Sequence, residues 1–377
     1  MTDRTEQARR YAIWKRTLFL LDLLLTTGIL AGILAGGWAV ALSSWVKSRI
    51  TGWSFQTAVY GGILWLGMSA FSFPLDWIGS FLLEHRFGLS RLSFPRWLLD
   101  VGKRLAVGGV LGLLVLEGLA ALIRQAPQGW WAWATLLWLG WTAFLTWVAP
   151  AWLIPLFYRQ RPLADLKLRG RLEQLLDRAQ ARVRGIFEVD LSRTTSKANA
   201  CLCGLGGTRR VLISDTLLAT HSPEEVEVVL AHELGHHRLR HLWILIGVGT
   251  AAGGLSLFLA DQAVRGFGSR LGVEAATDLA ALPLIGLVLF LAGLALMPLT
   301  HGISRRLEAA ADRYALKATG NPRAFISTMR RLGEQNLAEA DPPRWVEWLL
   351  YDHPPIGKRI ALAEEIMHNR GERTVTI

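Results

Sequence analysis

Six long apolar stretches alternate with polar segments along this chain of 377 residues. They cover about residues 17–42, 55–83, 105–123, 130–153, 242–264 and 279–303. Because about 20 apolar residues are enough for a helix to cross a bilayer, the pattern predicts an all-α polytopic membrane protein with about six transmembrane helices. The first 16 residues are polar and basic, and the apolar stretch after them is too long for a signal peptide, so we expect no cleaved leader.

Positive charge is concentrated in every second polar segment. The chain has 41 Lys and Arg against 30 Asp and Glu, a net charge of +11, although 51% of its residues are hydrophobic. Most of the Lys and Arg residues lie in segments 1–16, 84–104, 158–241 and 304–377. Nucleic-acid binding is one explanation of such a charge, but the alternation is typical of the positive-inside rule. We therefore expect a multi-pass membrane protein with both termini on the cytoplasmic side, and no nucleic-acid partner.

The polar segment 158–241 is predicted to be a catalytic segment inserted between the fourth and fifth transmembrane helices. Leucines recur at helical spacing over residues 162–183. Two predicted strands, 198–203 and 210–214, flank the glycine-rich turn 204–207 and form a small β-hairpin, and residues 187–191 resemble a further strand. We expect four parts: 1–157 with transmembrane helices 1–4, the catalytic segment 158–241, 242–303 with helices 5 and 6, and the C-terminal segment 304–377.

A metal-binding motif closes this catalytic segment. Residues 232–236 read H-E-L-G-H, and residues 222–225, S-P-E-E, supply the N-cap, first residue and capping box of a helix before them. His232 and His236 therefore lie one turn apart on one helix face, where both imidazoles can bind one zinc ion. Glu233 can take the proton of a water molecule that attacks a peptide carbonyl. The alternative is a chance match, but such polar residues on a buried helix are costly without a bound ligand.

A catalytic zinc ion has three protein ligands, so a third ligand must lie elsewhere in the chain. His237 and His241 are too close to His236 on the same helix, and we expect them on its polar face or at the membrane surface. The better candidate is Glu308, which follows the sixth apolar stretch and lies one turn before Asp312. Asp312 can accept a hydrogen bond from a ligand histidine. A salt bridge of these carboxylates with neighbouring arginines is the alternative.

Cys201 and Cys203 give no disulfide framework, because they are too close in sequence for an unstrained bridge. We expect them to be small, packed hydrophobic residues.

Several motifs together resemble those of the type I CAAX prenyl proteases, a family of integral-membrane zinc endopeptidases. In chain order they are E-H-R-F-G-L-S at 84–90, A-P at 149–150, I-P-L-F at 154–157, S-K-A-N-A at 196–200, V-L-I-S-D-T-L-L at 211–218, H-E-L-G-H at 232–236, S-R-R-L-E at 304–308 with Asp312, and D-H-P-P at 352–355 with Arg359. The resemblance covers about residues 84–362. Two departures stand out: Asp352 replaces the usual serine, and Cys201 and Cys203 stand where aromatic residues are common.

The resemblance implies a hollow intramembrane barrel of helices around a water-filled chamber, with a gluzincin-like catalytic segment on its cytoplasmic side. Polar residues inside the spans then either line this chamber or hydrogen-bond neighbouring helices, and the sequence leaves both alternatives open. These residues are Asp22, Asp76, Glu117, Asp261 and His301.

The resemblance also implies roles for the site residues. One zinc ion per chain is bound by the two motif histidines and Glu308, while Asp312 orients a ligand. Asn199 and Ala200 lie on a strand to which an extended substrate adds through backbone hydrogen bonds. His353 stabilises the oxyanion, and Arg359 either supports His353 or binds a substrate carboxylate.

We therefore predict a membrane-embedded zinc metalloendopeptidase, similar to CAAX prenyl proteases, that processes the C-terminal part of prenylated or other membrane-associated peptides. Its partners are a peptide or protein substrate and the lipid bilayer; the sequence makes no prediction about oligomeric state. A heat-shock-type quality-control protease is an alternative, although it resembles this chain less at 84–90 and 352–359. A further alternative is a non-catalytic scaffold, in which zinc only joins the fifth and sixth spans to the catalytic segment; such a protein has no need of Glu233. A transporter is supported only by the polar residues within the spans.

Overall fold

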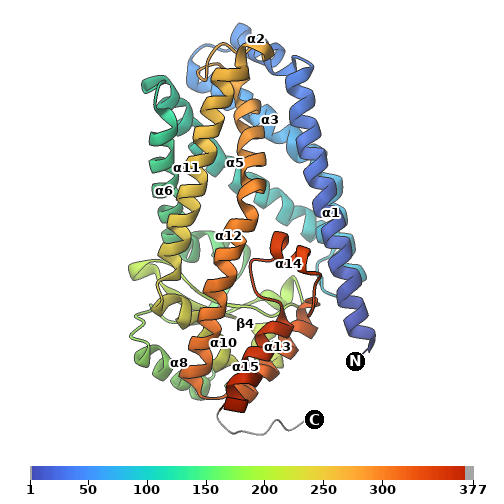
Figure 1. Cartoon of the computed structure of the whole chain (residues 1–377), viewed down its shortest axis with the longest axis vertical. Coiled ribbons are helices and arrows are strands. Elements are labelled where there is room, and N and C mark those ends of the chain that lie inside the picture. Colours follow the sequence, from blue (N-terminus) through green and yellow to red (C-terminus); the bar gives the residue numbers. More distant parts are fainter. Residues whose placement is uncertain (1, 370–377) are drawn as a thin grey trace.

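The structure is a computed structural model that describes residues 2–369. Long helices stand side by side in one elongated body, and a small sheet with several shorter helices lies at one end of it (Figure 1). Within the described residues, six helical stretches are long and apolar enough to cross a membrane, namely Arg4–Ala35, Trp53–Arg86, Phe94–Gln125, Trp130–Phe157, His241–Leu271 and Leu279–Thr319. The predicted number and order of transmembrane helices are confirmed.

These helices extend beyond the apolar stretches that predicted them, because polar residues continue the helices at their ends. The helices of the membrane part are, in chain order, α1 (Thr2–Ala35), α2 (Trp38–Arg49), α3 (Trp53–Asp76), a π-helix (Trp77–Leu82), α4 (Leu83–Arg86), α5 (Phe94–Gln125), α6 (Trp130–Val148), a π-helix (Ala149–Leu153), α7 (Ile154–Phe157), α11 (His241–Phe267) and α12 (Leu282–Thr319). Helix α12 is the most important extension, since it continues without a break through Glu308 and Asp312 and ends at Gly320, which has a positive φ of 61°.

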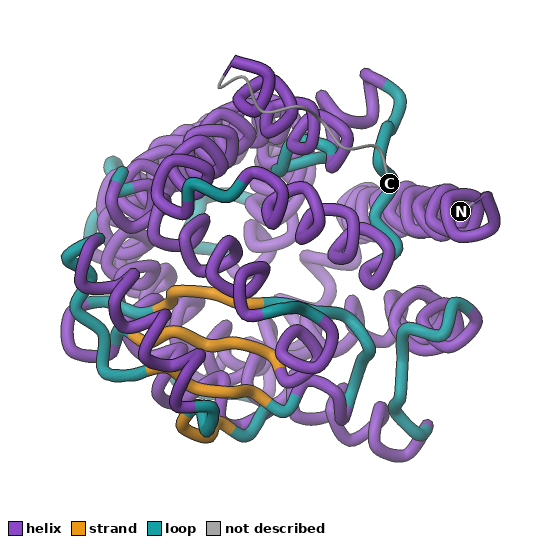
Figure 2. Tube along the Cα trace, turned by 90° about the horizontal axis from the view of Figure 1, so that it is seen from below, coloured by secondary structure: helices purple, strands orange, loops and turns teal. Residues whose placement is uncertain are grey.

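The membrane helices form a wall rather than a solid bundle. In each of the first four spans only 6% of the most apolar 18-residue stretch is buried within the protein. The corresponding shares in the last two spans are 22% and 39%. Seen from the end that carries the sheet, the long helices are distributed around the periphery of the molecule (Figure 2). Such low burial is expected of helices that contact lipid on one side and the interior of a barrel on the other.

The sheet of the catalytic segment has four strands, which are β1 (Gln160–Pro162), β2 (Ile186–Val189), β3 (Ala200–Cys203) and β4 (Arg210–Ser214). Their order is β1-β2-β4-β3, with β2 parallel to β4 and the other pairs antiparallel. The predicted hairpin is present as β3 and β4, but the sheet is larger than a hairpin because β2 and β1 extend it. Strand β3 lies at an edge of the sheet.

The helix that carries the H-E-L-G-H motif is α10 (Pro223–Arg238), and it begins as the sequence predicts. Ser222 caps it in a capping box with Glu225, and Pro223 occupies its first turn. Helix α10 packs in one hydrophobic core with the sheet and with helices on both sides of it in sequence. The other helices of this end are α8 (Leu166–Arg178), α9 (Asp215–Thr220), α13 (Pro322–Asn336), α14 (Arg344–Leu350) and α15 (Ile356–Asn369).

A close approach of two helices places the motif beside α12. Gly235 of α10 faces Ala311 of α12, and a Cβ at Gly235 would lie 2.9 Å from Ala311 Cα. Since real Cβ atoms do not approach a backbone so closely, glycine is required here. Helix α10 ends shortly after this contact, where Arg240 takes a left-handed conformation with φ 58° before α11 begins.

Candidate metal centre and active site

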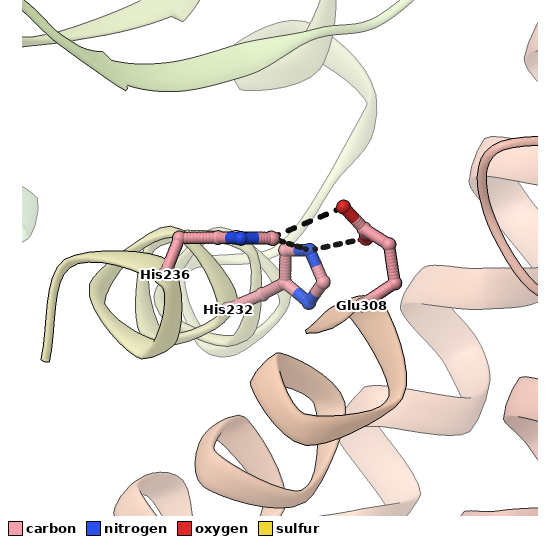
Figure 3. Close-up of side chains that lie close together, drawn as sticks. All are labelled: His232, His236 and Glu308. Carbon is pink, nitrogen blue, oxygen red and sulfur yellow. Dashed lines mark hydrogen bonds and ion pairs between the residues drawn. The ribbon is translucent and has the colours of Figure 1, made fainter. Parts of the chain in front are cut away.

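Helices α10 and α12 bring three potential metal ligands to one point. Nε2 of His232 lies 3.1 Å from Oε2 of Glu308, and Nε2 of His236 lies 3.3 Å from Oε1 of the same carboxylate. The two imidazole Nε2 atoms are 3.2 Å apart. Figure 3 shows the two rings and the carboxylate pointing toward one another from the two helices. The predicted third ligand is therefore next to the motif histidines.

The donor set fits a divalent metal ion. Donors about 2.0–2.1 Å from a tetrahedral ion lie roughly 3.3 Å from one another, which is close to the separations seen here. Glu308 Oε2 is buried, and apart from the ring of His232 at 3.1 Å it has no polar partner among the described residues. Burial lowers the pKa of His232, but its hydrogen bonds to Asp312 and Glu308 outweigh burial and raise this pKa to about 9. The carboxylates of Glu308 and Asp312 beside this ring thus favour a cation at the site.

Asp312 fixes the orientation of the His232 ring. Its Oδ1 lies 2.8 Å from His232 Nδ1, and the carboxylate is 1% exposed. When Nδ1 donates its hydrogen to Asp312, Nε2 keeps a free lone pair directed at Glu308 and His236. Arg359 of α15 donates to the same carboxylate, from Nε to Oδ2 at 2.8 Å and from Nη2 to Oδ1 at 2.6 Å. The Arg359 guanidinium thus binds Asp312 rather than His353, with which the sequence had associated it.

The predicted position of His241 is wrong. We expected it on a polar face or at the membrane surface, but it is 3% exposed and its Nδ1 lies 3.0 Å from Nδ1 of His236. The helix break at Arg240 turns the chain so that the first residue of α11 contacts the ring of His236. Both motif histidines therefore have a partner for their second ring nitrogen.

Glu233 lies between the metal centre and the sheet. It follows His232 on α10, and its Oε2 lies 3.3 Å from the backbone nitrogen of Leu202 on β3. Its side chain lines a cavity of about 770 Å³ together with His232, His236, Glu308 and His353. A carboxylate in this place can exchange protons with a molecule that occupies the cavity beside the three ligands.

The predicted substrate strand is present at the edge of the sheet. Ser214 N donates to Asn199 O at 2.9 Å, and Asn199 N donates to Ser214 Oγ at 3.0 Å. Because hydrogen-bonded pairs alternate in an antiparallel ladder, the backbone groups of Ala200 and Leu202 point away from β4. Asn199 and Ala200 both line the 770 Å³ cavity and a second cavity of about 410 Å³, which is also lined by His232 and Glu233. No other strand pairs with this edge of β3 within the described residues, although the outward N–H of Leu202 points to Glu233.

His353 approaches the centre from the loop between α14 and α15. Its Nε2 lies 3.3 Å from Glu308 Oε1, and its Nδ1 lies 2.8 Å from Oδ1 of Asp352. The hydrogen bond with Asp352 raises the pKa of His353 and lowers that of Asp352. The aspartate that replaces the usual serine therefore orients His353 and stabilises its charged form.

Two residues of α12 hold the segment that presents His353. This role was not predicted for either of them. Arg305 Nη1 donates to the backbone oxygens of Glu347, at 2.9 Å, and Tyr351, at 2.5 Å. His301 Nδ1 lies 3.0 Å from the backbone oxygen of Leu349. One feature of the sequence could have indicated that Arg305 lies near the site. Arg305 is three residues before Glu308 and therefore on the same side of α12.

Other polar residues in the spans have protein partners. Glu117 accepts a hydrogen bond from Ser54 at 2.8 Å, and Asp261 accepts one from Trp130 at 2.7 Å. Asp76 lies 3.5 Å from Arg104. All three residues therefore take part in contacts between helices, although Glu117 Oε1 is buried without a hydrogen-bond partner among the described residues.

The sequence comparisons identify the family of this chain. Residues 162–367, more than half of the chain, match the family described as Peptidase family M48. The chain belongs to this family. Residues 2–159 match the description CAAX prenyl protease N-terminal, five membrane helices, and in this chain they contain four long spans and the shorter α2. The protein is a membrane metalloprotease of a family that uses a metal cofactor, which confirms the predicted enzyme class.

Similar proteins cover nearly the whole chain. The uncharacterized metalloprotease YhfN of Bacillus subtilis is 27% identical over 95% of this chain and 85% of its own length. The CAAX prenyl protease 1 of Saccharomyces cerevisiae is 27% identical over 84% of this chain and 73% of its own length. The crystal structure of S. mikatae Ste24p matches with a TM-score of 0.87 at 21% identity, and covers 97% of this chain and 90% of that chain. This likeness confirms the predicted membrane barrel fold.

Proposed function

We propose that the protein is a zinc endopeptidase that cuts near the C terminus of prenylated or otherwise membrane-associated polypeptides. The convergence of His232, His236 and Glu308 beside Glu233 and an open strand edge is the observation that carries the proposal. Two histidines and a glutamate are a donor set typical of catalytic zinc. The substrate class is supported by the similarity to relatives named CAAX prenyl protease 1.

The residues of the site divide the reaction among them. His232, His236 and Glu308 would hold a zinc ion, which would supply a Lewis acid for the peptide carbonyl and for water. Glu233 accepts a proton from the attacking water and later donates it to the leaving amine. Asp312, held by Arg359, orients the ring of His232. His353 donates from Nε2 to the developing oxyanion, and Asp352 stabilises its positive charge.

The edge of β3 aligns the substrate. An extended peptide that pairs with the outward backbone groups of Ala200 and with the backbone oxygen of Leu202 passes beside Glu233, which accepts the N–H of Leu202. Main-chain pairing suits an endopeptidase, because it holds many sequences in one register. Asn199, exposed at the start of this edge, is placed to bind a substrate amide group. Arg359 contributes through Asp312 rather than by contact with the substrate.

We also propose that the sheet end of the molecule is cytoplasmic. Arginines and lysines of segments 1–16, 84–104 and 158–241 lie in the parts of the chain that start or end there, as the positive-inside rule requires. The four predicted parts remain our proposal for the organisation of the chain. Residues 370–377 of the last part lie outside the described residues.

The test is the cleavage of a prenylated CAAX peptide by the purified protein, with the products read by mass spectrometry. We expect the Glu233→Gln variant to keep its zinc and to lose about 10²–10⁴-fold in rate, because the proton acceptor is removed while the ligands remain. Glu224→Gln is the matched control on α10, since Glu224 pairs with Arg171 at the surface.

Unchanged cleavage by Glu233→Gln would refute the mechanism. Cleavage of an unfolded membrane protein but not of prenylated or unprenylated CAAX peptides would support the quality-control alternative instead.

A further inference from the structure

The two cysteines of the chain form a pair on the edge strand of the active site. Cys201 and Cys203 both belong to β3, and residues two apart on a strand point to the same face. In the register of the hairpin they stand opposite Leu212 and Arg210. Leu202, between them, points to the other face, where it packs on the hydrophobic core. The thiols therefore lie side by side on the face turned away from that core.

Both thiols are accessible from the active-site cavity. Cys203 Sγ lies 3.8 Å from the backbone oxygen of Arg210. The nearness of the two thiols raises the pKa of Cys201 and lowers that of Cys203. Both side chains are free and half-buried. They line the 770 Å³ cavity that also contains Glu233 and His236. A reagent that enters the active-site cavity thus meets both thiols at once.

The geometry of this pair does not suit a disulfide. On an extended strand, residues two apart have Cα atoms roughly 6.6–6.8 Å apart, at the upper limit for a disulfide. Neighbouring side chains on one strand face also lie parallel, which does not suit the required torsion about the sulfur–sulfur bond. The pair therefore persists as a dithiol, whose two sulfur atoms can bind one larger atom between them.

We propose that Cys201 and Cys203 are a binding site for one thiophilic centre of the trivalent arsenic type, and that its occupation closes the active-site cavity to substrate. Soft thiol ligands select such centres, and a pyramidal atom can be bound by two thiols that project from the same face of one strand. With an arsenoxide, each thiol forms one arsenic–sulfur bond, the bonding between arsenic and oxygen is lost, and the two thiol protons leave with the oxygen as water. Arsenic stays trivalent throughout.

The position of the pair explains why occupation blocks the enzyme. Leu202, which lies between the two cysteines, directs its backbone nitrogen to Glu233 at 3.3 Å. A group bound to the flanking thiols protrudes into the same cavity and obstructs a peptide that pairs with this strand. This second part of the inference rests on the proposed function, whereas the binding of arsenic does not.

Binding is tested with phenylarsine oxide on the purified full-length protein. We expect one phenylarsenic group per chain by intact mass, retained in excess monothiol and released by a dithiol. Because the second bond is intramolecular, Cys201→Ser and Cys203→Ser should each release the group on the order of 100-fold faster than the wild type. Equal retention by either single variant, or rapid loss from the wild type, would overturn the dithiol site.

A second measurement needs no variant. One equivalent of phenylarsine oxide should protect two thiols per chain from a maleimide, and protection of a single thiol would refute chelation. Peptide cleavage by the treated wild type should then fall and return after addition of the dithiol. Continued cleavage with arsenic bound would disprove the blocking role, whereas a protein that never cleaves the peptide would fail the proposed function and leave the binding result intact.

Discussion

At the scale of single residues, the centre depends on carboxylates that are shared between partners. Asp312 accepts hydrogen bonds from His232 and from Arg359, and it is almost fully buried. Glu308 lies within 3.3 Å of three histidine rings, those of His232, His236 and His353. Each carboxylate therefore fixes the position of more than one functional side chain.

Replacement of Asp312 by asparagine is expected to weaken the metal site. The amide keeps the shape of the side chain but loses the charge that holds Arg359 and the Nδ1 hydrogen of His232. We expect metal affinity to fall by about 10–100-fold, as for other residues that orient a ligand histidine. Competition with a chelator measures this affinity. Asp352→Asn serves as the control, because Asp352 contacts His353 and not a predicted ligand; equal affinities of the two variants would contradict the role of Asp312.

The sequence predicted those site residues whose relation is local. His232 with His236, and Glu308 with Asp312, are one helical turn apart, so helix geometry alone groups them. The contact of Arg359 with Asp312 joins residues 47 positions apart, and no periodicity indicates it. His241 was misplaced for another reason. Its burial depends on a helix break at Arg240, which no glycine or proline marks.

At the scale of elements, the contact between α10 and α12 sets the distance between the ligands. An alanine at Gly235 would press its Cβ against the backbone of Ala311, which cannot move aside as a side chain can. We expect Gly235→Ala to lower the free energy of unfolding by about 1–3 kcal/mol and to reduce metal content. Thermal unfolding and elemental analysis measure the two effects.

Gly170→Ala is the matched control for this variant. It lies in α8 with open space around its Cα, so the added methyl group should raise stability by about 0.5–1 kcal/mol. A Gly235→Ala protein as stable and as metal-loaded as the control would show that the close approach does not position the ligands.

The segment with His353 depends on Arg305 for its position. Arg305→Met keeps much of the side-chain length but removes the donors to Glu347 and Tyr351. We expect peptide cleavage to fall by up to about 100-fold, because misplacement of a catalytic group by about 1 Å has such an effect. Metal content should not change. Arg306→Met, at an exposed neighbouring position, is the control, and a similar loss in both variants would argue against this role.

The β-sheet shows how far local patterns predict an element. The hairpin of β3 and β4 was predicted because the glycine-rich turn lies between its strands. Strand β1 has three residues, too few for a pattern, and the parallel pairing of β2 with β4 joins strands that are not consecutive. Tertiary packing rather than local sequence selects these pairings.

At the scale of the whole molecule, the first helix contacts the catalytic end directly. Arg16 of α1 lies 2.9 Å from Glu339, in the segment before α14. Glu84 lies 2.9 Å from Lys197 and accepts a hydrogen bond from Tyr11 at 2.5 Å. The long apolar stretches predicted the six spans because lipid imposes a minimum length on each one. These contacts between distant parts could not be predicted, since isolated charges in a sequence do not specify their partners.

The central claim is that one metal ion joins the catalytic segment to the sixth transmembrane helix. Its most direct test is the zinc content of the purified wild type and of Glu308→Ala, measured by elemental analysis on samples whose thermal unfolding shows that both are folded. The account predicts about one zinc ion per chain in the wild type and a large loss in the variant. A wild type without zinc, or a Glu308→Ala protein that keeps as much zinc as the wild type, would contradict it.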